Sequence, residues 1–575
     1  MHGLRLAALS TACLAVAPSS SPARPTTSAP PITHMIMIME ENRSFDHYFG
    51  TYPGANGFPH GTCVPLNPAQ PNLGCVAPFH DPHDVSAGGP HGNAAAIADI
   101  DGTGATPPFD GFVYQQTTGA GSLCSNKVRP DDLPTKSCKG VFPGILRHDV
   151  MGYHNASEIP NYWAYAQHFV LQDNLFEGVR GASPASHLDI ASEWVATCTN
   201  PTVVSTCTTT LNPKYVNGTN VVFPWVNLYQ LLDLNGVSWK WYLGTGQEPD
   251  CDDDEMTCEP AYQANGILSY WNPVPGFASV EAQGPAYLAM HNPQMDQFLV
   301  DINNGTLPQV SWIVPPFDYS DHPVSGVTAG QDFVTSLVNA VMQSPYWQNT
   351  AIFISWDDWG GFYDHVLPPT IDMNSKGIQG YGLRVPGLLV SAWAKPGFID
   401  NSLLSFNAYA VLMENLFMDG ARLDPTALGE PDSRPTIRDE LTTASYPGGA
   451  TAPIGQLINE FNFSQAPLPT LVLNTHVPPG IGVKCGSTNA AYPEDCTTNK
   501  VTVSWDSVSG KYIPGPFTYH VLRDGVAPSS DCVTVTKTTC IDKKVPVGTH
   551  YYTVYSVDPN NVSSPVSAAA EADVP

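Results

Sequence analysis

Residues 35–50 read MIMIMEENRSFDHYFG and join a fully apolar run to a dense polar cluster. The run from Met35 to Met39 shows no alternation of apolar and polar residues, which is typical of a parallel strand covered on both faces. Glu41 and Asn42 follow directly, and ligands of open α/β sheets bind at such strand ends. The stretch therefore predicts a buried strand that ends at a site. Alternatively, Asn42 and Asp46 satisfy backbone donors in a capped loop.

A second segment, AIFISWDDWGGFYDH at residues 351–365, has the same organisation. Its apolar part predicts a second buried strand, and Asp357 and Asp358 follow it. Two adjacent carboxylates repel each other unless a cation neutralises them, although a solvated turn would also tolerate them. Together with Glu41 and Asn42 they form an all-oxygen set that suits Mg, Mn or Ca.

A third segment, ASPASHLDIASEW at residues 182–194, contains Ser183 directly before Pro184. This order predicts a helix N-cap followed by proline at the first helical position. The start of a helix offers free N–H groups and a positive dipole end, where a phosphoryl group is stabilised. For this segment alone, an ordinary capping serine is the more economical interpretation.

The bulk composition indicates a multidomain globular protein. The chain has 575 residues, which is longer than one hydrophobic core usually supports, and 42% of its residues are hydrophobic. The 52 acidic and 24 basic residues leave a formal charge of -28, which repels nucleic acid and anionic lipid surfaces. Nucleic acid is therefore not expected as a partner.

The N-terminal residues predict export. Arg5 precedes an apolar run from Leu6 to Ala17, and a stretch rich in Ser, Pro and Thr follows, as in a secretory signal peptide with a disordered spacer over residues 1–29. No later segment is long and apolar enough for an integral membrane span. We expect an extracellular or periplasmic protein. Lipidation at Cys13 is a second possibility, with a poor match before it.

Cysteine spacing supports the same compartment. Twelve of the 13 cysteines fall into near neighbours, which predicts six small disulfide loops. A metal site is disfavoured because no CxxC pair occurs. The pairs are Cys63/Cys75, Cys124/Cys138, Cys198/Cys207, Cys251/Cys258, Cys485/Cys496 and Cys532/Cys540.

The pattern of strands predicts two folded parts. Residues 30–473 alternate apolar runs with helical stretches, which indicates an α/β domain, and further strands are expected at Phe169 to Gln172 and Val385 to Ser391. Residues 474–499 are predicted as a linker. Residues 500–575 alternate cleanly and predict a small β-sandwich that resembles a fibronectin type III module, with a cell-surface or polymer ligand as its possible partner.

Four collinear segments carry a resemblance to a known family. They are MEENRSFDHYFGTYPGANGF, DYSDHP, SPYWQNTAIFISWDDWGGFYDHVLPP and GLRVPGLLVSAWAKPG. They resemble the bacterial phosphoesterase family of acid phosphatases and non-specific phospholipases C, over about residues 34–459. The resemblance implies an alkaline-phosphatase-like, three-layer α/β fold with a mostly parallel central sheet.

The resemblance also implies roles for single residues. Glu41, Asn42, Asp357 and Asp358 match the metal ligands, for one or more divalent ions among Mg, Mn, Ca and Zn. Ser183 falls at the nucleophile position, and His83 and His322 are similar to histidines near the phosphate. The chain departs from the family pattern after Ser183, at Ala185-Ser186, and after His83, at Asp84-Val85. Substrate contacts in those loops are therefore open.

These features predict a secreted, metal-dependent phosphoesterase that works through a phosphoserine, on a phosphate-ester small molecule or a phospholipid head group. Ser instead of Thr at position 183 favours the phosphatase type over the phospholipase C type. Three alternatives stay open: a serine carboxylesterase, because GASPA resembles the GxSxG elbow; a sulfatase, since Cys63 begins a partial CxPxR motif; and a secreted binding protein with an inactive enzyme domain.

Overall fold

The computed structural model describes residues 30–575 apart from several gaps. The longer gaps are 102–106, 119–147, 197–221, 249–260, 370–380 and 425–441, and the shorter ones are 324, 447–448, 475–477, 479–480, 486–493, 497, 506–507, 509–515, 529, 558–562, 565 and 568. The expected signal peptide at 1–29 and the cysteine pairs Cys124/Cys138, Cys198/Cys207 and Cys251/Cys258 lie outside the described residues.

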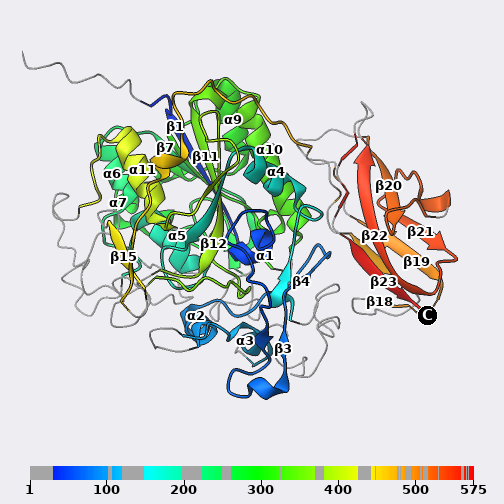
Figure 1. Cartoon of the computed structure of the whole chain (residues 1–575). Coiled ribbons are helices and arrows are strands. Elements are labelled where there is room, and N and C mark those ends of the chain that lie inside the picture. Colours follow the sequence, from blue (N-terminus) through cyan, green and yellow to red (C-terminus); the bar gives the residue numbers. More distant parts are fainter. Residues whose placement is uncertain are drawn as a thin grey trace, which may run out of the picture.

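An eight-stranded sheet forms the centre of the larger domain (Figure 1). Its order is β13-β6-β12-β11-β1-β10-β7, and β14 pairs with β6. The strands are β1 (His34–Glu40), β6 (Val170–Phe176), β7 (Trp239–Leu243), β10 (Val310–Val314), β11 (Thr350–Trp356), β12 (Arg384–Ser391), β13 (Phe398–Asp400) and β14 (Leu404–Ser405).

The four strands expected in this domain are confirmed, and the sheet is mostly parallel. One direction differs from the prediction: β12 runs antiparallel to both β11 and β6. All eight residues of β12 are buried, so its apolar sequence reflects burial on both faces of the sheet. Such a sequence does not distinguish a parallel from an antiparallel strand.

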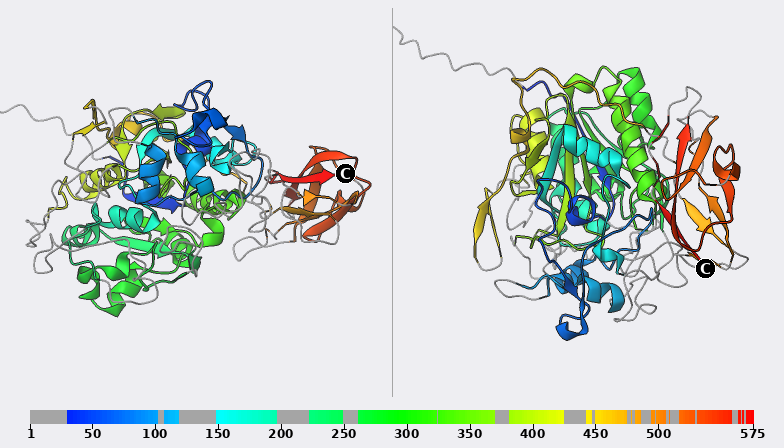
Figure 2. Two further views of the ribbon diagram at one scale, coloured as in Figure 1. Left: turned by 90° about the horizontal axis from the view of Figure 1, so that it is seen from below. Right: turned by 45° about the vertical axis from the view of Figure 1, so that its right-hand side comes forward.

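Helices cover both faces of the sheet and give three layers (Figures 1 and 2). One layer contains α4 (Pro160–His168), α9 (Asp296–Asn304) and α10 (Val327–Met342). The other contains α5 (Ser183–Ser192), α6 (Leu228–Leu234), α7 (Ala278–Glu281) and α11 (Asn407–Phe417). The predicted three-layer α/β domain is therefore confirmed.

The C-terminal part forms two small sheets around a core of its own. One sheet has the order β17-β19-β21 and the other β18-β23-β22-β20. Part of the segment predicted as a linker, 474–499, supplies β17 and β18 to them. The strands are β17 (Gly482–Lys484), β18 (Glu494–Asp495), β19 (Lys500–Ser504), β20 (Thr518–Arg523), β21 (Thr539–Lys543), β22 (Gly548–Val557) and β23 (Ala570–Val574).

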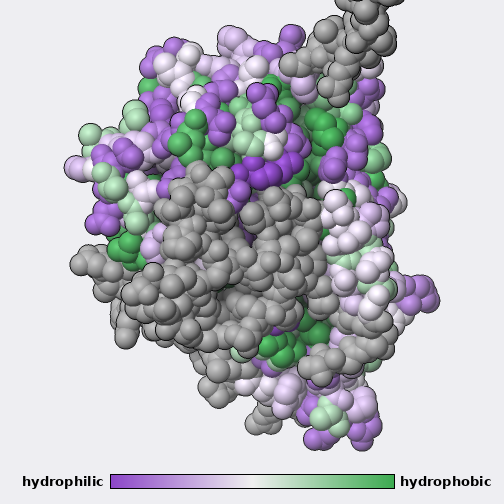
Figure 3. All heavy atoms as spheres, turned by 90° about the vertical axis from the view of Figure 1, so that its left-hand side faces the viewer, coloured by the Kyte–Doolittle hydropathy of each residue, from purple (hydrophilic) through white to green (hydrophobic). Residues whose placement is uncertain are grey.

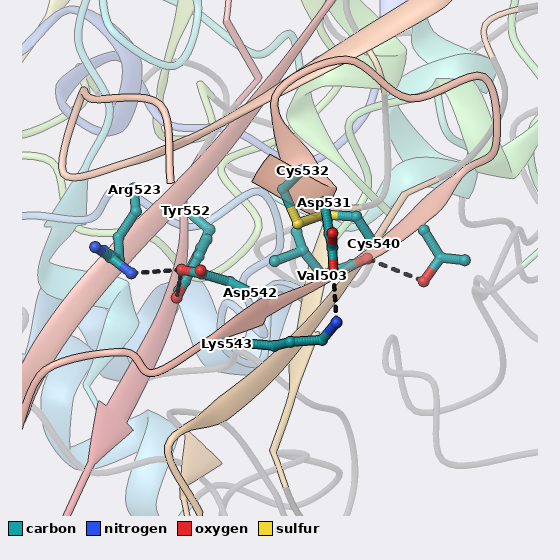
Figure 4. Close-up of a disulfide and its surroundings, with 9 residues drawn as sticks. Val503, Arg523, Asp531, Cys532, Cys540, Asp542, Lys543 and Tyr552 are labelled. Carbon is teal, nitrogen blue, oxygen red and sulfur yellow. Dashed lines mark hydrogen bonds and ion pairs between the residues drawn. A yellow bond between two sulfur atoms is a disulfide. The ribbon is translucent and has the colours of Figure 1, made fainter. Parts of the chain in front are cut away.

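Three of the expected disulfides are present: Cys63–Cys75, Cys485–Cys496 and Cys532–Cys540. The last joins β21 to the preceding turn, next to a buried carboxylate in the C-terminal core (Figure 4). Arg523 and Tyr552 both donate to Asp542 there, which satisfies its charge inside an apolar sandwich.

Among the residues that Figure 3 colours by hydropathy, apolar and polar surface are intermixed. Among the described residues, none of the helices combines the length and the hydrophobicity that a membrane span needs.

Candidate active site

The register of β1 and β11 brings two distant acidic segments to the same level of the sheet. Met39 lies opposite Ser355 and Glu40 opposite Trp356, so Glu41 and Asp357 leave the sheet side by side. The N–H of Asp357 continues the ladder by donating to the carbonyl of Glu40 at 2.9 Å. Parallel pairing therefore produces the cluster that the two sequence segments predicted.

Hydrogen bonds join three of the four expected ligands, Asn42, Asp357 and Asp358. The backbone N–H of Asn42 donates to Asp357 Oδ1 at 2.9 Å, and Asn42 Nδ2 donates to Asp358 Oδ1 and Oδ2 at 3.0 and 3.2 Å. Asp358 Oδ1 also accepts from the N–H of Gly360 at 2.7 Å. All four ligand candidates, including Glu41, are fully buried.

The close approach of the two segments requires glycine at position 360. Gly360 has a φ of +60°, and a Cβ there would lie 2.3 Å from the carbonyl oxygen of Asn42. Asn42 itself has a φ of +60°, a conformation that asparagine adopts more readily than most residues. The Gly-Gly pair thus shapes the loop that carries Asp358.

Two buried oxygen atoms in this cluster fit a cation. Among the described residues, Asn42 Oδ1 and Asp357 Oδ2 have no hydrogen-bond partner. An unsatisfied carboxylate oxygen away from water is costly, and a divalent ion would supply the missing positive charge. The donor set of carboxylates and one amide is suited to a hard or intermediate ion.

His187 joins the same cluster from helix α5. Its Nε2 lies 2.9 Å from Glu41 Oε1 and 4.0 Å from Asp357 Oδ2. Ligand atoms of Glu41, His187 and Asp357 all lie within 4.8 Å of one another. The position was identifiable, because residues four apart share one face of a helix and His187 lies four residues after Ser183.

Ser183 lies over this cluster at the start of α5. Its Oγ donates to Glu41 Oε2 at 3.0 Å and to Asp358 Oδ2 at 3.4 Å. Ser183 was expected as the N-cap, but Ala182 is the N-cap and Ser183 is the first helical residue, so the helix begins one residue earlier than expected. The hydroxyl faces the carboxylates and does not cap the helix. The side chain of Ala182 offers no acceptor to the helix N–H groups, so this end suits an anion.

His322 and His91 lie together beside an aromatic wall. Their ring centroids are 6.2 Å apart, and both side chains are buried. The ring of Trp271 is 5.9 Å from that of His322 and 6.5 Å from that of His187, so one indole lies between His322 and the acidic cluster. The sequence prediction missed His91, although its setting in a Gly-Pro-His-Gly turn was a usable signal.

His83, the other histidine expected near the phosphate, has different neighbours. Its Nδ1 lies 2.6 Å from Asp81 Oδ1, and its Nε2 lies 4.0 Å from Glu571 Oε2 in the C-terminal sheets. The Nε2 side of His83 therefore faces the C-terminal part of the chain, whereas the ring of His91 lies next to that of His322.

Glu177 adds a further buried carboxylate at this edge of the sheet. Its Oε1 accepts from the N–H of Leu383 at 2.7 Å, and its Oε2 has no hydrogen-bond partner among the described residues. Burial, and then the charge of Asp358, hold the pKa of Glu177 well above its usual range. Arg180, between Glu177 and Ser183, donates from Nε to Asn93 Oδ1 at 3.0 Å.

A second acidic cluster is saturated by arginine. Arg384 Nε lies 3.0 Å from both oxygens of Asp364, and Arg384 Nη2 lies 2.9 Å from Asp46 Oδ1. His365 Nδ1 lies 2.7 Å from the other oxygen of Asp46. Asp46, Asp364 and His365 lie close enough together to hold a metal ion. The guanidinium of Arg384 already supplies the positive charge that the two carboxylates need.

The hydrogen bonds of Ser183 do not match a serine carboxylesterase. Within the described part of the chain, its hydroxyl bonds to two carboxylates and to no histidine. A catalytic triad requires a histidine base on the serine and an acid behind that histidine.

Comparison with known proteins identifies the family of the chain. The profile of the Phosphoesterase family matches residues 32–417. The non-hemolytic phospholipase C of Burkholderia pseudomallei is 28% identical over 474 residues, covering 73% of this chain and 60% of that protein. The non-hemolytic phospholipase C of Pseudomonas aeruginosa is 26% identical over 426 residues, covering 67% of this chain and 54% of that protein.

This chain thus spans little more than half of the length of those relatives. Among solved structures, a phosphonate monoester hydrolase from Silicibacter pomeroyi is similar at a TM-score of 0.27 and 14% identity, over 50% of this chain and 72% of that chain. That likeness is too loose to bear on the site. The family profile covers most of the chain, including both acidic segments and Ser183, and the chain belongs to the phosphoesterase family.

Proposed function

We propose that this protein is a secreted, metal-dependent phosphoesterase that hydrolyses phosphate esters through a phosphoserine at Ser183. The observation that carries the proposal is the position of the Ser183 hydroxyl, at the first residue of a helix and 3.0 Å from a carboxylate of the buried acidic cluster. Glu41, Asn42, Asp357 and Asp358 would hold the ion, with His187 beside them. A bound divalent ion would supply positive charge that lowers the cost of ionising a serine and of collecting charge on phosphoryl oxygens.

The protein's own groups account for the remaining requirements. The uncapped start of α5 orients N–H groups and a positive dipole end toward a phosphoryl group bonded to Ser183 Oγ. Glu41 and Asp358 accept hydrogen bonds from that hydroxyl and so aim its lone pair away from them. In the attack, Ser183 Oγ forms a bond to phosphorus and its proton passes to a carboxylate that accepts its hydrogen bond, Glu41 or Asp358. The P–O bond to the leaving group breaks in line, and the displaced alkoxide takes a proton. Water then hydrolyses the phosphoserine from the opposite side.

His322 and His91 are the candidates for that proton transfer. The sequence suggested His83 and His322, and we retain His322 and propose His91 in place of His83 because its ring lies next to that of His322. A histidine that protonates the leaving group matters most when the leaving group is a poor one. Removing it should slow alkyl phosphate hydrolysis far more than p-nitrophenyl phosphate hydrolysis.

Trapping of the covalent intermediate tests the central claim. The protein is incubated with substrate and a divalent ion, quenched in acid and digested, and the peptide with Ser183 is examined for a phosphoryl group by mass spectrometry. Ser183→Ala should lose both the label and turnover. Ser192→Ala, on the same helix, is the matched control, because its hydroxyl bonds to Leu188 and Trp194 carbonyls away from the cluster. A fully active Ser183→Ala variant, or full activity after chelation, would contradict the proposal.

The substrate class is decided by a second assay. The relatives named above are phospholipases C, whereas a serine at position 183 favours the phosphomonoesterase type. Rates on p-nitrophenyl phosphate, p-nitrophenylphosphorylcholine and phosphatidylcholine, each with Mg, Mn, Ca or Zn, separate the two types. We propose the phosphomonoester as the better substrate, so a higher kcat/KM on phosphorylcholine esters would overturn this choice.

Export is supported by the disulfides. Three short-range pairs are closed in the structure, and such bonds persist in oxidising compartments. N-terminal sequencing of the protein from a culture supernatant would show whether the first 29 residues are removed.

A further inference from the structure

The C-terminal sheets contact the catalytic domain through the last strand, β23, on the side of the module that faces that domain (Figure 1). The N–H of Ala569, directly before β23, donates to the carbonyl of Pro82 at 2.7 Å. Two residues later, Glu571 Oε2 lies 4.0 Å from His83 Nε2. The His83 side chain is 3% exposed and that of Glu571 16%, so this contact is largely withdrawn from water.

The connecting chain is also attached to the catalytic domain. Leu473 exchanges two hydrogen bonds with the side chain of Asn339 on α10, at 2.7 and 3.1 Å. The carbonyl of Asn474 accepts a hydrogen bond from Asn161 Nδ2 on α4 at 3.0 Å. The side-chain Nδ2 of Asn474 donates to the carbonyl of Ser563 in the module at 2.5 Å. The module therefore has two separate attachments to the helices and loops beside it.

His83 lies between carboxylates from both parts of the chain. Asp81 contacts its Nδ1 at 2.6 Å, and Glu571 faces its Nε2. Burial lowers the pKa of His83, but the charges of Asp81, Glu571 and Glu158 outweigh burial, and the pKa is raised above 6.5. Burial raises the pKa of Glu571, although the charge of His83 opposes this.

We infer that the C-terminal module is docked on the catalytic domain and not merely tethered to it, and that the Asp81–His83–Glu571 series holds it more tightly when His83 is protonated. The inference does not depend on the reaction that the enzyme catalyses. The other titratable groups near the series are His80, Glu158, His154 and Asp149 in the catalytic domain and Tyr551 and Asp573 in the module. Burial raises the pKa of Asp149 to about 7, inside the same pH range.

The direction of the pH effect follows from the raised pKa of His83. A histidine whose pKa is higher in the docked state contributes docking stability in full below its undocked pKa, and this contribution is lost as the pH rises through the docked pKa. Docking should therefore weaken between pH 6 and pH 9. Burial raises the pKa of Glu571, so this carboxyl acts in the same direction as His83. Burial alone would raise the pKa of Asp81, but the charge and hydrogen bonds of His83 outweigh burial and lower this pKa, so Asp81 stays ionised throughout this window.

Hydrogen exchange at Ala569 measures docking directly, because its amide donates across the interface. Protection factors, corrected for intrinsic exchange, are measured at pH 6 and pH 9 on the full-length protein, with Val521 in β20 as an internal reference. We expect Ala569 to be protected at both pH values and up to about fivefold more at pH 6, since a partly exposed ion pair contributes up to about 1 kcal/mol.

The Glu571→Gln variant should keep protection at pH 9 and lose the gain at pH 6, and His83→Gln should do the same. Asp531→Asn is the matched control: it removes a carboxylate of an exposed ion pair with Lys543 elsewhere in the module and should leave Ala569 unchanged. An unprotected Ala569 amide in the wild type would overturn the docking. Equal protection at the two pH values, or an undiminished pH effect in Glu571→Gln, would overturn the role of His83.

Discussion

Replacing one carboxylate of the buried acidic cluster should have opposite effects on stability with and without a divalent ion. Ligand atoms of Glu41 and Asp357 lie within 4.8 Å of each other in a fully buried site. Two unit charges at that distance repel by about 3.5 kcal/mol at an effective dielectric constant near 20. His187, 2.9 Å from Glu41, offsets part of this when protonated. The metal-free protein should therefore gain about 1–3 kcal/mol of unfolding free energy in Asp357→Asn.

The same variant should lose the stabilisation that a divalent ion provides. An ion present at about a thousand times its dissociation constant stabilises a folded protein by about 4 kcal/mol. The amide side chain introduced by Asp357→Asn keeps an oxygen to accept from the N–H of Asn42. The amide lacks the negative charge of the carboxylate and has an NH2 group in place of its second oxygen. In the wild type that second oxygen, Oδ2, has no hydrogen-bond partner among the residues that the structure describes.

Tryptophan-monitored denaturation in chelator and in excess Mg, Mn, Ca or Zn measures both effects. Asp531→Asn, on an exposed ion pair with Lys543 in the C-terminal module (Figure 4), is the control for removing a charge elsewhere. The reasoning is refuted if Asp357→Asn is destabilised in chelator, or if divalent ions stabilise it as much as they stabilise the wild type.

Three further outcomes are expected. Ser183→Ala should lower kcat by about 10³-fold or more while leaving metal-induced stabilisation intact, as measured by steady-state kinetics and denaturation. Burial lowers the pKa of His47 well below 6.5, so folding favours the neutral side chain. The free energy of unfolding should therefore fall as the pH drops below 6.5. In urea titrations, His47→Gln should reduce the slope of this free energy against pH by up to about 1.4 kcal/mol per pH unit. Arg384→Met leaves Asp46 and Asp364 buried without their cation and should cost about 3–5 kcal/mol in denaturation, whereas an unchanged midpoint would show that these pairs are dispensable.

The strands and the acidic cluster were predictable because both depend on local patterns. The apolar runs around Met37 and Phe353 specify buried strands, and in parallel strands the residues that follow such runs emerge at one edge. The direction of β12 was not predictable in this way, since burial on both faces gives the same residue pattern in either direction. The exact start of α5 was missed by one residue because a long-range bond from Ser183 to Glu41 replaced the local cap.

The histidines were harder to place than the carboxylates, and the reason is physical. Glu41 and Asp357 are positioned by a backbone ladder, so their proximity follows from strand pairing. His83 and His91 lie in a single segment without regular structure, eight residues apart, where no periodicity relates a side chain to a face. Only tertiary contacts distinguish them: His83 turns to Glu571, and His91 turns to His322.

Several buried carboxylates meet at the acidic edge of the sheet. Glu41, Asp357, Asp358 and Glu177 are all fully buried, and His187 Nε2 lies 2.9 Å from Glu41 Oε1. Protonation relieves Glu177, whose pKa is raised, but Asp357 keeps an oxygen without a hydrogen-bond partner. A fold stabilised by only about 5–15 kcal/mol does not retain such an arrangement without a compensating interaction. A bound cation is the simplest one, and the same charge would then face the hydroxyl of Ser183.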